Sequence, residues 1–396
     1  MELKPMLFCD TKTVLSYMEP NFRFNLALKL PSIRKAEKAA PLIINRLELQ
    51  DNRFVVNETE YKMKVYRQCQ AQTNPFWLKP TCFFPIEDDF PFGDPETENN
   101  LFRAARGLAR LSLGEVNYDF DEYGFKISPD ESIQPGDIKL DESVNQRRGP
   151  KLDEIDELKY MCPEKSLLPC NHFIRLYVSG SMTQFPYTNM KMYQLMKELL
   201  TTFFGNRIGE WTIKKMNVAN CVLLRWPVNG RKPIVQKLET GESCSLKLNG
   251  IQSIIDSNAP LTSLKIYFSF HPTSLSDYPL LENAKRLVIS NHPASKFLSG
   301  LYSIQTDKVS FTWPLDADTI VMLIDIWMEK TRPIGVRYSF PIESKINLTT
   351  LDFYEVLEIS ADYMKFEMGS EAVLVVQYAK DDSKSYLTIE TVPKKK

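Results

Sequence analysis

The segment 307–340, DKVSFTWPLDADTIVMLIDIWMEKTRPIGVRYSF, restricts the possible folds more than any other stretch of the chain. A helix-like run lies between two strand-like runs, and Asp316 or Asp318 can begin the helix. Two parallel strands joined in this way require a right-handed crossover. The segment therefore predicts a β/α layer with a parallel sheet. The expected buried positions of the helix repeat at helical spacing: Ile320, Leu323, Ile324 and Trp327.

Similar units recur through the second half of the chain. The helix expected over 188–205 can be capped by Thr188 or Asn189. Its expected buried stripe is Tyr193, Met196, Leu199 and Phe203. Strand-like runs then start near Trp211, Ser245, Ser263, Arg286, Lys308 and Gly335. Because short strands alternate with helices at a period in the twenties, we expect an irregular layer of the leucine-rich-repeat kind.

Prolines divide the beginning of the chain into short helices. The pattern over 11–39 is helical, but Pro20 and Pro31 interrupt it. Because a residue that precedes proline is disfavoured in the helical region, Glu19 and Leu30 should lie at helix boundaries, and Pro41 should close the last helix. A cluster of short helices of this size leaves an apolar face that must pack on something.

The middle of the chain changes to strand periodicity. Residues 42–66 alternate with a period of two around a polar turn at 51–52, which predicts a β-rich module. We therefore expect an α+β or α/β protein in four parts. These parts are helices over 1–41, a β-rich module over 42–140, a linker and irregular segment over 141–187, and an α/β repeat-like domain over 188–396.

The motifs that could carry chemistry are weak. Residues 119–130 resemble a calcium loop, but Tyr123 stands at the fifth position of the loop, where a carboxylate or amide is expected, which favours a structural turn. Cys162, Cys170 and His172 lack a fourth zinc ligand at a conventional distance. The only other histidines, His271 and His292, each precede a proline. We therefore predict no catalytic residue, no metal and no cofactor, and a protein that is not an enzyme.

Charge and cysteine content narrow the classes of partner. The formal net charge is −1, so no global field favours nucleic acid or an anionic membrane, although a local basic patch is compatible with it. Seven scattered cysteines indicate a reducing compartment, which predicts a cytoplasmic or nuclear protein. The longest apolar run, 319–328, is far shorter than the roughly 20 residues of a membrane span.

Four segments of the chain resemble a large roundworm-expanded family of F-box-like proteins. They are residues 14–49, 56–67 and 118–140, and LIDIWMEKTRPIGVRYSF at 323–340. The resemblance implies an adaptor whose N-terminal helices bind Skp1, the linker of a cullin ubiquitin ligase, while a C-terminal surface selects a target. On this interpretation the partner-binding residues are Leu15, Met18, Leu26, Leu28, Pro31 and Ile33.

Three hypotheses follow from these observations. The first is an F-box-like adaptor, with Arg34, Lys35 and Lys38 on the solvent side of the helices. The second is an interaction or structural protein without ligase coupling, in which residues 11–40 pack inside the fold. The third is an unrecognised enzyme, which would need a concave pocket with convergent titratable groups.

Overall fold

The computed structural model has a mixed α+β fold built on a large, mostly open β-sheet. The part of the chain that it describes comprises residues 7–68, 114–119, 127–140, 171–187, 190–218, 220–241, 244–267, 279–290, 306–315, 317–330, 332–342, 354–360, 362–381 and 384–394, and these hold seven α-helices. Two compact units can be distinguished. The first contains residues 1–42, 47–210 and 221–231, and the second contains residues 43–46, 211–220 and 232–396.

The first unit begins with the short helices that the prolines predict. Glu19 is the N-cap of the second helix, and its carboxylate accepts a hydrogen bond from the Phe22 amide at 3.0 Å. Leu30 ends this helix directly before Pro31, and the third helix ends before Pro41. The predicted boundaries are confirmed. The elements are α1 (Phe8–Ser16), α2 (Pro20–Lys29), the 3-10 turn η1 (Pro31–Ile33) and α3 (Arg34–Ala39).

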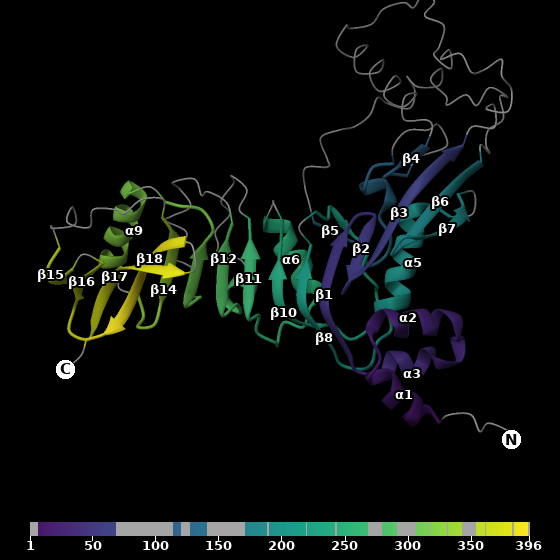
Figure 1. Cartoon of the computed structure of the whole chain (residues 1–396), viewed down its shortest axis with the longest axis horizontal. Helices are drawn as coiled ribbons and strands as arrows, with labels where there is room; N and C mark the ends of the chain where they lie inside the picture. Colours follow the sequence, from purple (N-terminus) through teal and green to yellow (C-terminus); the bar gives the residue numbers. More distant parts are fainter. Residues whose placement is uncertain are drawn as a thin grey trace, which may run out of the picture. The chain divides into compact units, whose positions relative to one another are not determined.

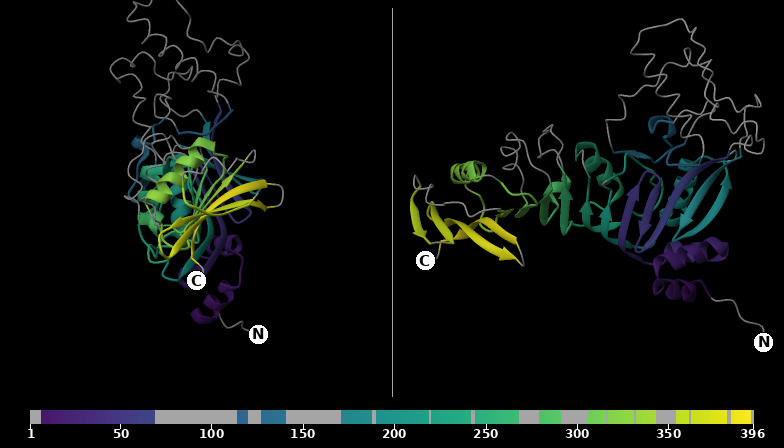
Figure 2. Two further views of the ribbon diagram at one scale, coloured as in Figure 1. Left: turned by 90° about the vertical axis from the view of Figure 1, so that its left-hand side faces the viewer. Right: turned by 45° about the horizontal axis from the view of Figure 1, so that its top comes forward.

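An antiparallel sheet follows the helices, as the period of two predicts (Figure 2). Its strands in spatial order are β1 (Leu42–Gln50), β2 (Arg53–Val56), β3 (Thr59–Gln68), β6 (Asn171–Val178) and β7 (Ser181–Pro186), and β4 (Gly114–Val116) pairs with β3. The expectation of an irregular segment up to residue 187 is wrong for β6 and β7. Ile174 and Leu176 are buried at a period of two, and β6 pairs with β3 along its whole length.

Helix α5 (Met192–Phe204) completes the core of the first unit. The rings of Phe24 from α2 and Phe203 from α5 stack with centroids 4.6 Å apart, and Phe54 stacks on Tyr61 at the same separation. Figure 1 shows the purple N-terminal helices beside α5. The predicted stripe of α5 is only half correct, because Met196 and Phe203 are buried whereas Tyr193 and Leu199 are not.

The N-terminus of α5 is capped from a distant loop. The carboxylate of Asp119 accepts hydrogen bonds from the amides of Met192 at 2.8 Å and Tyr193 at 2.9 Å, and from the Tyr187 hydroxyl at 3.0 Å. The expected caps, residues 188 and 189, lie outside the described residues. Asp119, the first position of the calcium-loop pattern, therefore caps a helix. Residues 120–126 of that pattern also lie outside the described residues.

Parallel strands form the first part of the second unit. Each strand pairs with the next one along the chain, so their spatial order repeats their sequence order. Right-handed crossovers between strands in this order place the connecting helices on one face of the sheet. The strands are β8 (Trp211–Asn217), β10 (Ile234–Glu239), β11 (Ser263–Ile266), β12 (Arg286–Ile289), β13 (Lys308–Phe311) and β14 (Arg337–Pro341), with helices α6 (Cys244–Ile254), α7 (Pro279–Glu282) and α9 (Ala317–Glu329) between them.

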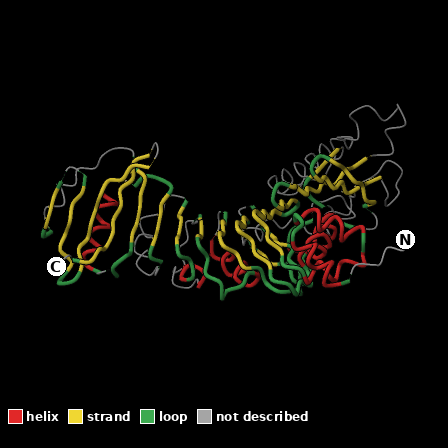
Figure 3. Tube along the Cα trace, turned by 60° about the horizontal axis from the view of Figure 1, so that its bottom comes forward, coloured by secondary structure: helices red, strands yellow, loops and turns green. Residues whose placement is uncertain are grey.

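The prediction for 307–340 is confirmed, and the strand expected near Ser245 is wrong. Helix α9 connects the parallel strands β13 and β14, and all four predicted core positions are at most 1% exposed. Figure 3 shows this helix against the strands. Residues 244–254 instead form α6, whose buried Leu248, Ile251 and Ile254 recur every three residues, a spacing that suits a helix and not a strand.

Four antiparallel strands end the second unit. They are β15 (Val356–Ile359), β16 (Tyr363–Met368), β17 (Ala372–Asp381) and β18 (Lys384–Pro393), and β18 continues the sheet by pairing with β14. The indole nitrogen of Trp327 in α9 donates to the Thr391 hydroxyl at 2.9 Å, which ties the helix to β18. The small pair β5 (Ile138–Lys139) with β9 (Leu223–Leu224) and the 3-10 turn η4 (Asp130–Ser132) belong to the first unit.

Candidate docking surface on the N-terminal helices

Four of the six predicted partner-binding residues lie inside the helical cluster. Leu15 is 2% exposed and forms a small core with Ala36 and Ala40. The partly buried residues packed against this core are Met18, Leu26 and Ile33. These side chains hold α1, α2 and α3 together, and Met18, Leu26 and Ile33 keep part of their surface exposed.

The other two predicted residues are exposed. Leu28 is 38% exposed and Pro31 is also exposed. Leu28 belongs to a set of exposed apolar side chains on or beside these helices that sequence reasoning otherwise missed. We call this set the outer apolar surface, and its members are Leu7, Phe8, Val14, Tyr17, Phe22, Leu28 and Leu30.

A buried arginine belongs to the inward stripe of α2. The inward stripe of this helix contains Pro20, Arg23, Phe24 and Ala27, which follow helical spacing. Because arginine is almost never fully buried unless it is paired, the pattern favours a stripe that avoids Arg23 and runs through Phe22 instead. In the structure Arg23 is 1% exposed and Phe22 is 57% exposed.

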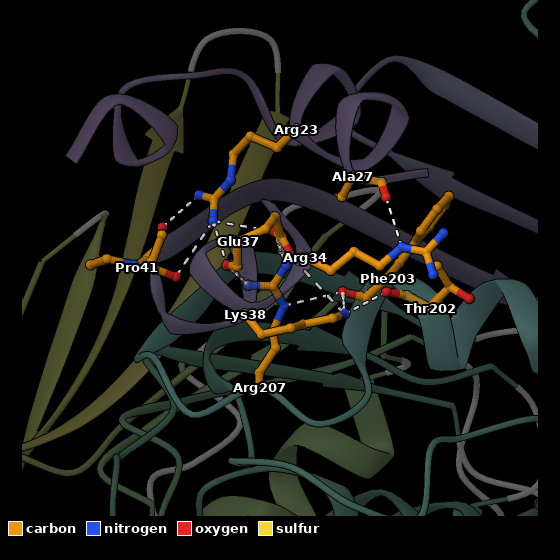
Figure 4. A network of polar contacts seen from close by, with 10 residues as sticks. Arg23, Ala27, Arg34, Glu37, Lys38, Pro41, Thr202, Phe203 and Arg207 are labelled. Carbon is orange, nitrogen blue, oxygen red and sulfur yellow. Dashed lines mark hydrogen bonds and ion pairs between the residues drawn. The ribbon is translucent and has the colours of Figure 1, made fainter. Parts of the chain in front are cut away.

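The charge of Arg23 is compensated by Glu37 from α3. An Arg23 guanidinium nitrogen lies 3.2 Å from a Glu37 carboxylate oxygen, and Arg207, which follows α5, pairs with the same oxygen. Figure 4 shows the two guanidinium groups converging on this carboxylate. All three residues are about 1% exposed. One carboxylate therefore links α2, α3 and the segment after α5 in the interior.

Backbone carbonyls satisfy most of the remaining donors. Arg23 donates to the carbonyls of Pro41 at 2.6 Å and Glu37 at 3.2 Å, while Arg207 donates to the carbonyl of Phe203 at 3.1 Å. These carbonyls belong to the ends of α3 and α5 or follow them, where the helix dipole favours positive charge. The two arginines therefore act as C-terminal caps as well as ion-pair partners.

Two further cations cap helices. Lys38 donates to the carbonyls of Thr202 and, at 3.0 Å, Phe203 at the end of α5. Arg34 donates to the Ala27 carbonyl at 2.8 Å near the end of α2. The placement of Lys38 on the solvent side is therefore wrong, because its side chain is only 18% exposed. Figure 4 shows both side chains reaching toward these carbonyls.

Burial lowers the pKa values of the cations in this cluster. Burial lowers the pKa of Lys38 to about 7, and the neighbouring Arg207 charge adds to the effect while Glu37 opposes it. Burial also lowers the pKa of Arg23 to about 10 and lowers that of Arg207. A lysine with such a pKa can act as a base in an enzyme. Here the Lys38 nitrogen donates to two carbonyls at the end of α5, so the side chain caps that helix.

The residues considered for metal binding gain no support as a site. Among the described residues, no group of three or more His, Cys, Asp or Glu side chains is arranged to hold a metal ion. Cys162, Cys170, His271 and His292 lie outside the described residues, as does the basic pair at 147–148. Within the described part of the chain, no helix is long and apolar enough to cross a membrane.

Comparison with known proteins gives one partial match. Residues 191–344 match a family described as Domain of unknown function (DUF3557). The match begins at the cap of α5 and ends after β14, so the N-terminal helices lie outside it. No curated protein and no solved structure matches the chain.

Proposed function

We propose that this chain is a non-enzymatic, F-box-like adaptor. Its N-terminal helices dock on Skp1 and its C-terminal strand layer selects a target protein, which would make it a substrate-recognition subunit of a cullin ubiquitin ligase in the cytoplasm or nucleus. The observation that carries the proposal is the outer apolar surface. Several apolar side chains are exposed on or beside helices that also pack against one another through an inner core.

The arrangement suits docking because the helices are held rigidly. The ion pairs of Glu37 fix the backs of α2 and α3, so a partner would meet a surface that is already ordered. Preordered surfaces lose less conformational entropy on binding. Aromatic side chains are common among the residues that dominate binding energy, and Tyr17 is 88% exposed while Phe22 is 57% exposed.

The second part of the proposal concerns the parallel strands. Strand starts from β8 to β14 are 22 to 29 residues apart, and each strand pairs only with its sequence neighbours within this series. Leucine-rich repeats have periods of about 20–29 residues and bind partners through their strands. We propose that this layer is repeat-like in the same sense.

Binding of purified full-length chain to Skp1, followed by biolayer interferometry, tests the adaptor role. The variant Tyr17→Glu/Phe22→Glu should weaken binding at least tenfold, because it places charges in an apolar interface. Met182→Glu is the matched control, since Met182 is 46% exposed on β7 and lies outside the outer apolar surface. An absence of Skp1 binding by wild-type protein, with a standard F-box protein binding in parallel, would refute the ligase role.

A second candidate is an interaction protein without ligase coupling. It is favoured by the internal packing of Leu15, Met18, Leu26 and Ile33, which the adaptor hypothesis had assigned to a partner. In that case the chain would not bind Skp1, and the outer apolar surface would bind another protein. Co-purification from cells with and without the Tyr17→Glu/Phe22→Glu change would separate the two, because only the adaptor carries Skp1 and cullin with it.

A further inference from the structure

Positively charged side chains form a row across the parallel strands of the second unit. The strand register places Lys215 beside Lys237, Lys237 beside Ser263, Arg286 beside Lys308, and Lys308 beside Arg337. The pairing of β11 with β12 places Ser263 next to Arg286. Five of the six positions in one row are therefore basic. We call these five residues, Lys215, Lys237, Arg286, Lys308 and Arg337, the basic row.

The basic row lies on the face of the sheet opposite to the buried core positions of the same strands. The residue after each of the six row positions is buried, at most 1% exposed: Met216, Leu238, Leu264, Leu287, Val309 and Tyr338. Since successive side chains of a strand point to opposite faces, the row itself points away from that core. Lys237, Arg286 and Lys308 are exposed, and the side chains of Lys215 and Arg337 are 52% and 42% exposed.

Little negative charge balances this row. Glu239 pairs with Lys215 at 3.2 Å and with Lys265 at 2.6 Å, and Glu390 lies 3.8 Å from Arg337. Within the described part of the chain, Lys237 and Lys308 form no ion pair. The net charge of the whole chain is −1, so the row is a local concentration of positive charge on an otherwise balanced protein.

Folding alone does not require this arrangement. Like charges directly opposite each other on neighbouring strands are destabilising. The next row on the same face is mostly neutral, and it consists of Asn217, Glu239, Lys265, Val288, Ser310 and Ser339. Small neutral residues therefore suffice on this face. The repulsion within the basic row would be relieved by a bound anionic partner.

We propose that the basic row is a binding site for an extended acidic segment of a partner protein. Neighbouring strands are about 4.8 Å apart, so six strands span roughly 24 Å, which matches about seven or eight residues of extended chain. The two rows described above contain no aromatic side chain, and Tyr267, which follows on the same face, already packs against Lys265 with the ammonium 5.3 Å from the ring centroid. Single-stranded nucleic acid is usually bound by stacking its bases on several such rings. The surface therefore favours a carboxylate-rich peptide.

This inference names the chemistry of the target in the proposed adaptor and rests on that function, but peptide binding does not depend on Skp1. The test measures fluorescence anisotropy of a labelled peptide with about eight glutamates, titrated with the full-length chain at low and physiological salt. We expect binding that weakens with salt, and no binding of a glutamine peptide of equal length. The variant Lys237→Gln/Lys308→Gln should bind about tenfold more weakly.

The double variant is chosen because neither lysine has a carboxylate partner among the described residues, so the change leaves no buried charge behind there. Lys12→Gln/Lys35→Gln is the matched control, since it removes the same charge from exposed positions of the first unit. The proposal is overturned if wild-type chain does not bind the acidic peptide, if both double variants lose affinity equally, or if single-stranded DNA of equal charge binds more tightly. If the wild-type chain binds Skp1 but not the acidic peptide, this site alone is refuted. If it binds the peptide but not Skp1, only the ligase role is refuted.

Discussion

Replacing Glu37 with glutamine tests whether one buried carboxylate holds the helical cluster to the first unit. Glu37→Gln keeps the size of the side chain but removes the charge that both Arg23 and Arg207 face. Breaking a buried ion pair by removing one partner costs about 3–5 kcal/mol, because the remaining charge is uncompensated. Both arginines keep their bonds to backbone carbonyls, so we expect the lower end, about 3 kcal/mol.

Thermal unfolding followed by circular dichroism measures this loss. For a unit of this size, about 3 kcal/mol corresponds to a fall of the midpoint by roughly 6–12 °C. Glu198→Gln is the control, because Glu198 is an exposed carboxylate of α5 and its replacement should change the midpoint little. A midpoint of Glu37→Gln close to that of the control would refute the reasoning.

A variant that removes all three charges provides a sharper test. In Arg23→Met/Glu37→Leu/Arg207→Met no charge is left buried without a partner, so this triple variant should unfold at a higher temperature than Glu37→Gln. If the triple variant is the less stable of the two, the cost of the single change does not come from uncompensated arginines.

Three other changes test neighbouring parts of the first unit. The pKa of Lys38 is about 7 in the folded chain and 10.5 ordinarily, so between these pH values the unfolded chain binds more protons and the free energy of unfolding should rise with pH. In Lys38→Met this rise should be smaller. An unchanged dependence of the free energy of unfolding on pH, measured by urea titrations, would contradict the assignment. Asp119→Ala should lower the free energy of unfolding by about 1–2 kcal/mol, because α5 loses its N-terminal cap; equal urea midpoints would exclude this role. Gly209→Ala would place a Cβ atom 2.6 Å from the Ala39 carbonyl oxygen, so the free energy of unfolding should fall by about 1–3 kcal/mol in calorimetry. An unchanged melting temperature would show that the backbone shifts without cost.

Local signals in the sequence predict the helix and strand boundaries well. Pro20, Pro31 and Pro41 separate the first helices because proline restricts its own backbone and that of the preceding residue. The helix over 317–329 is recognisable because its core positions follow one unbroken stripe of apolar residues.

Predictions fail where a distant contact changes what a residue can do. Arg23 belongs to the buried stripe of α2 only because Glu37 and Arg207 meet it there, and neither is its neighbour in sequence. The side chain of Lys38 is drawn inward by carbonyls at the end of α5, more than 160 residues away. Of the predicted docking residues, Leu15 belongs to a buried core and Met18, Leu26 and Ile33 pack against it, while the exposed Tyr17 and Phe22 were not among them.

The amino-acid sequence by itself determined the types of most elements, because backbone sterics and apolar periodicity act over a few residues. Only the tertiary structure decided which charges are buried and which are aligned. Lys215 and Arg337 belong to one row because six strands pair in a particular register, and a shift of one residue in that register would turn them toward the core. Register depends on contacts between segments far apart in the chain, and therefore the basic row could not be recognised before the strands were paired.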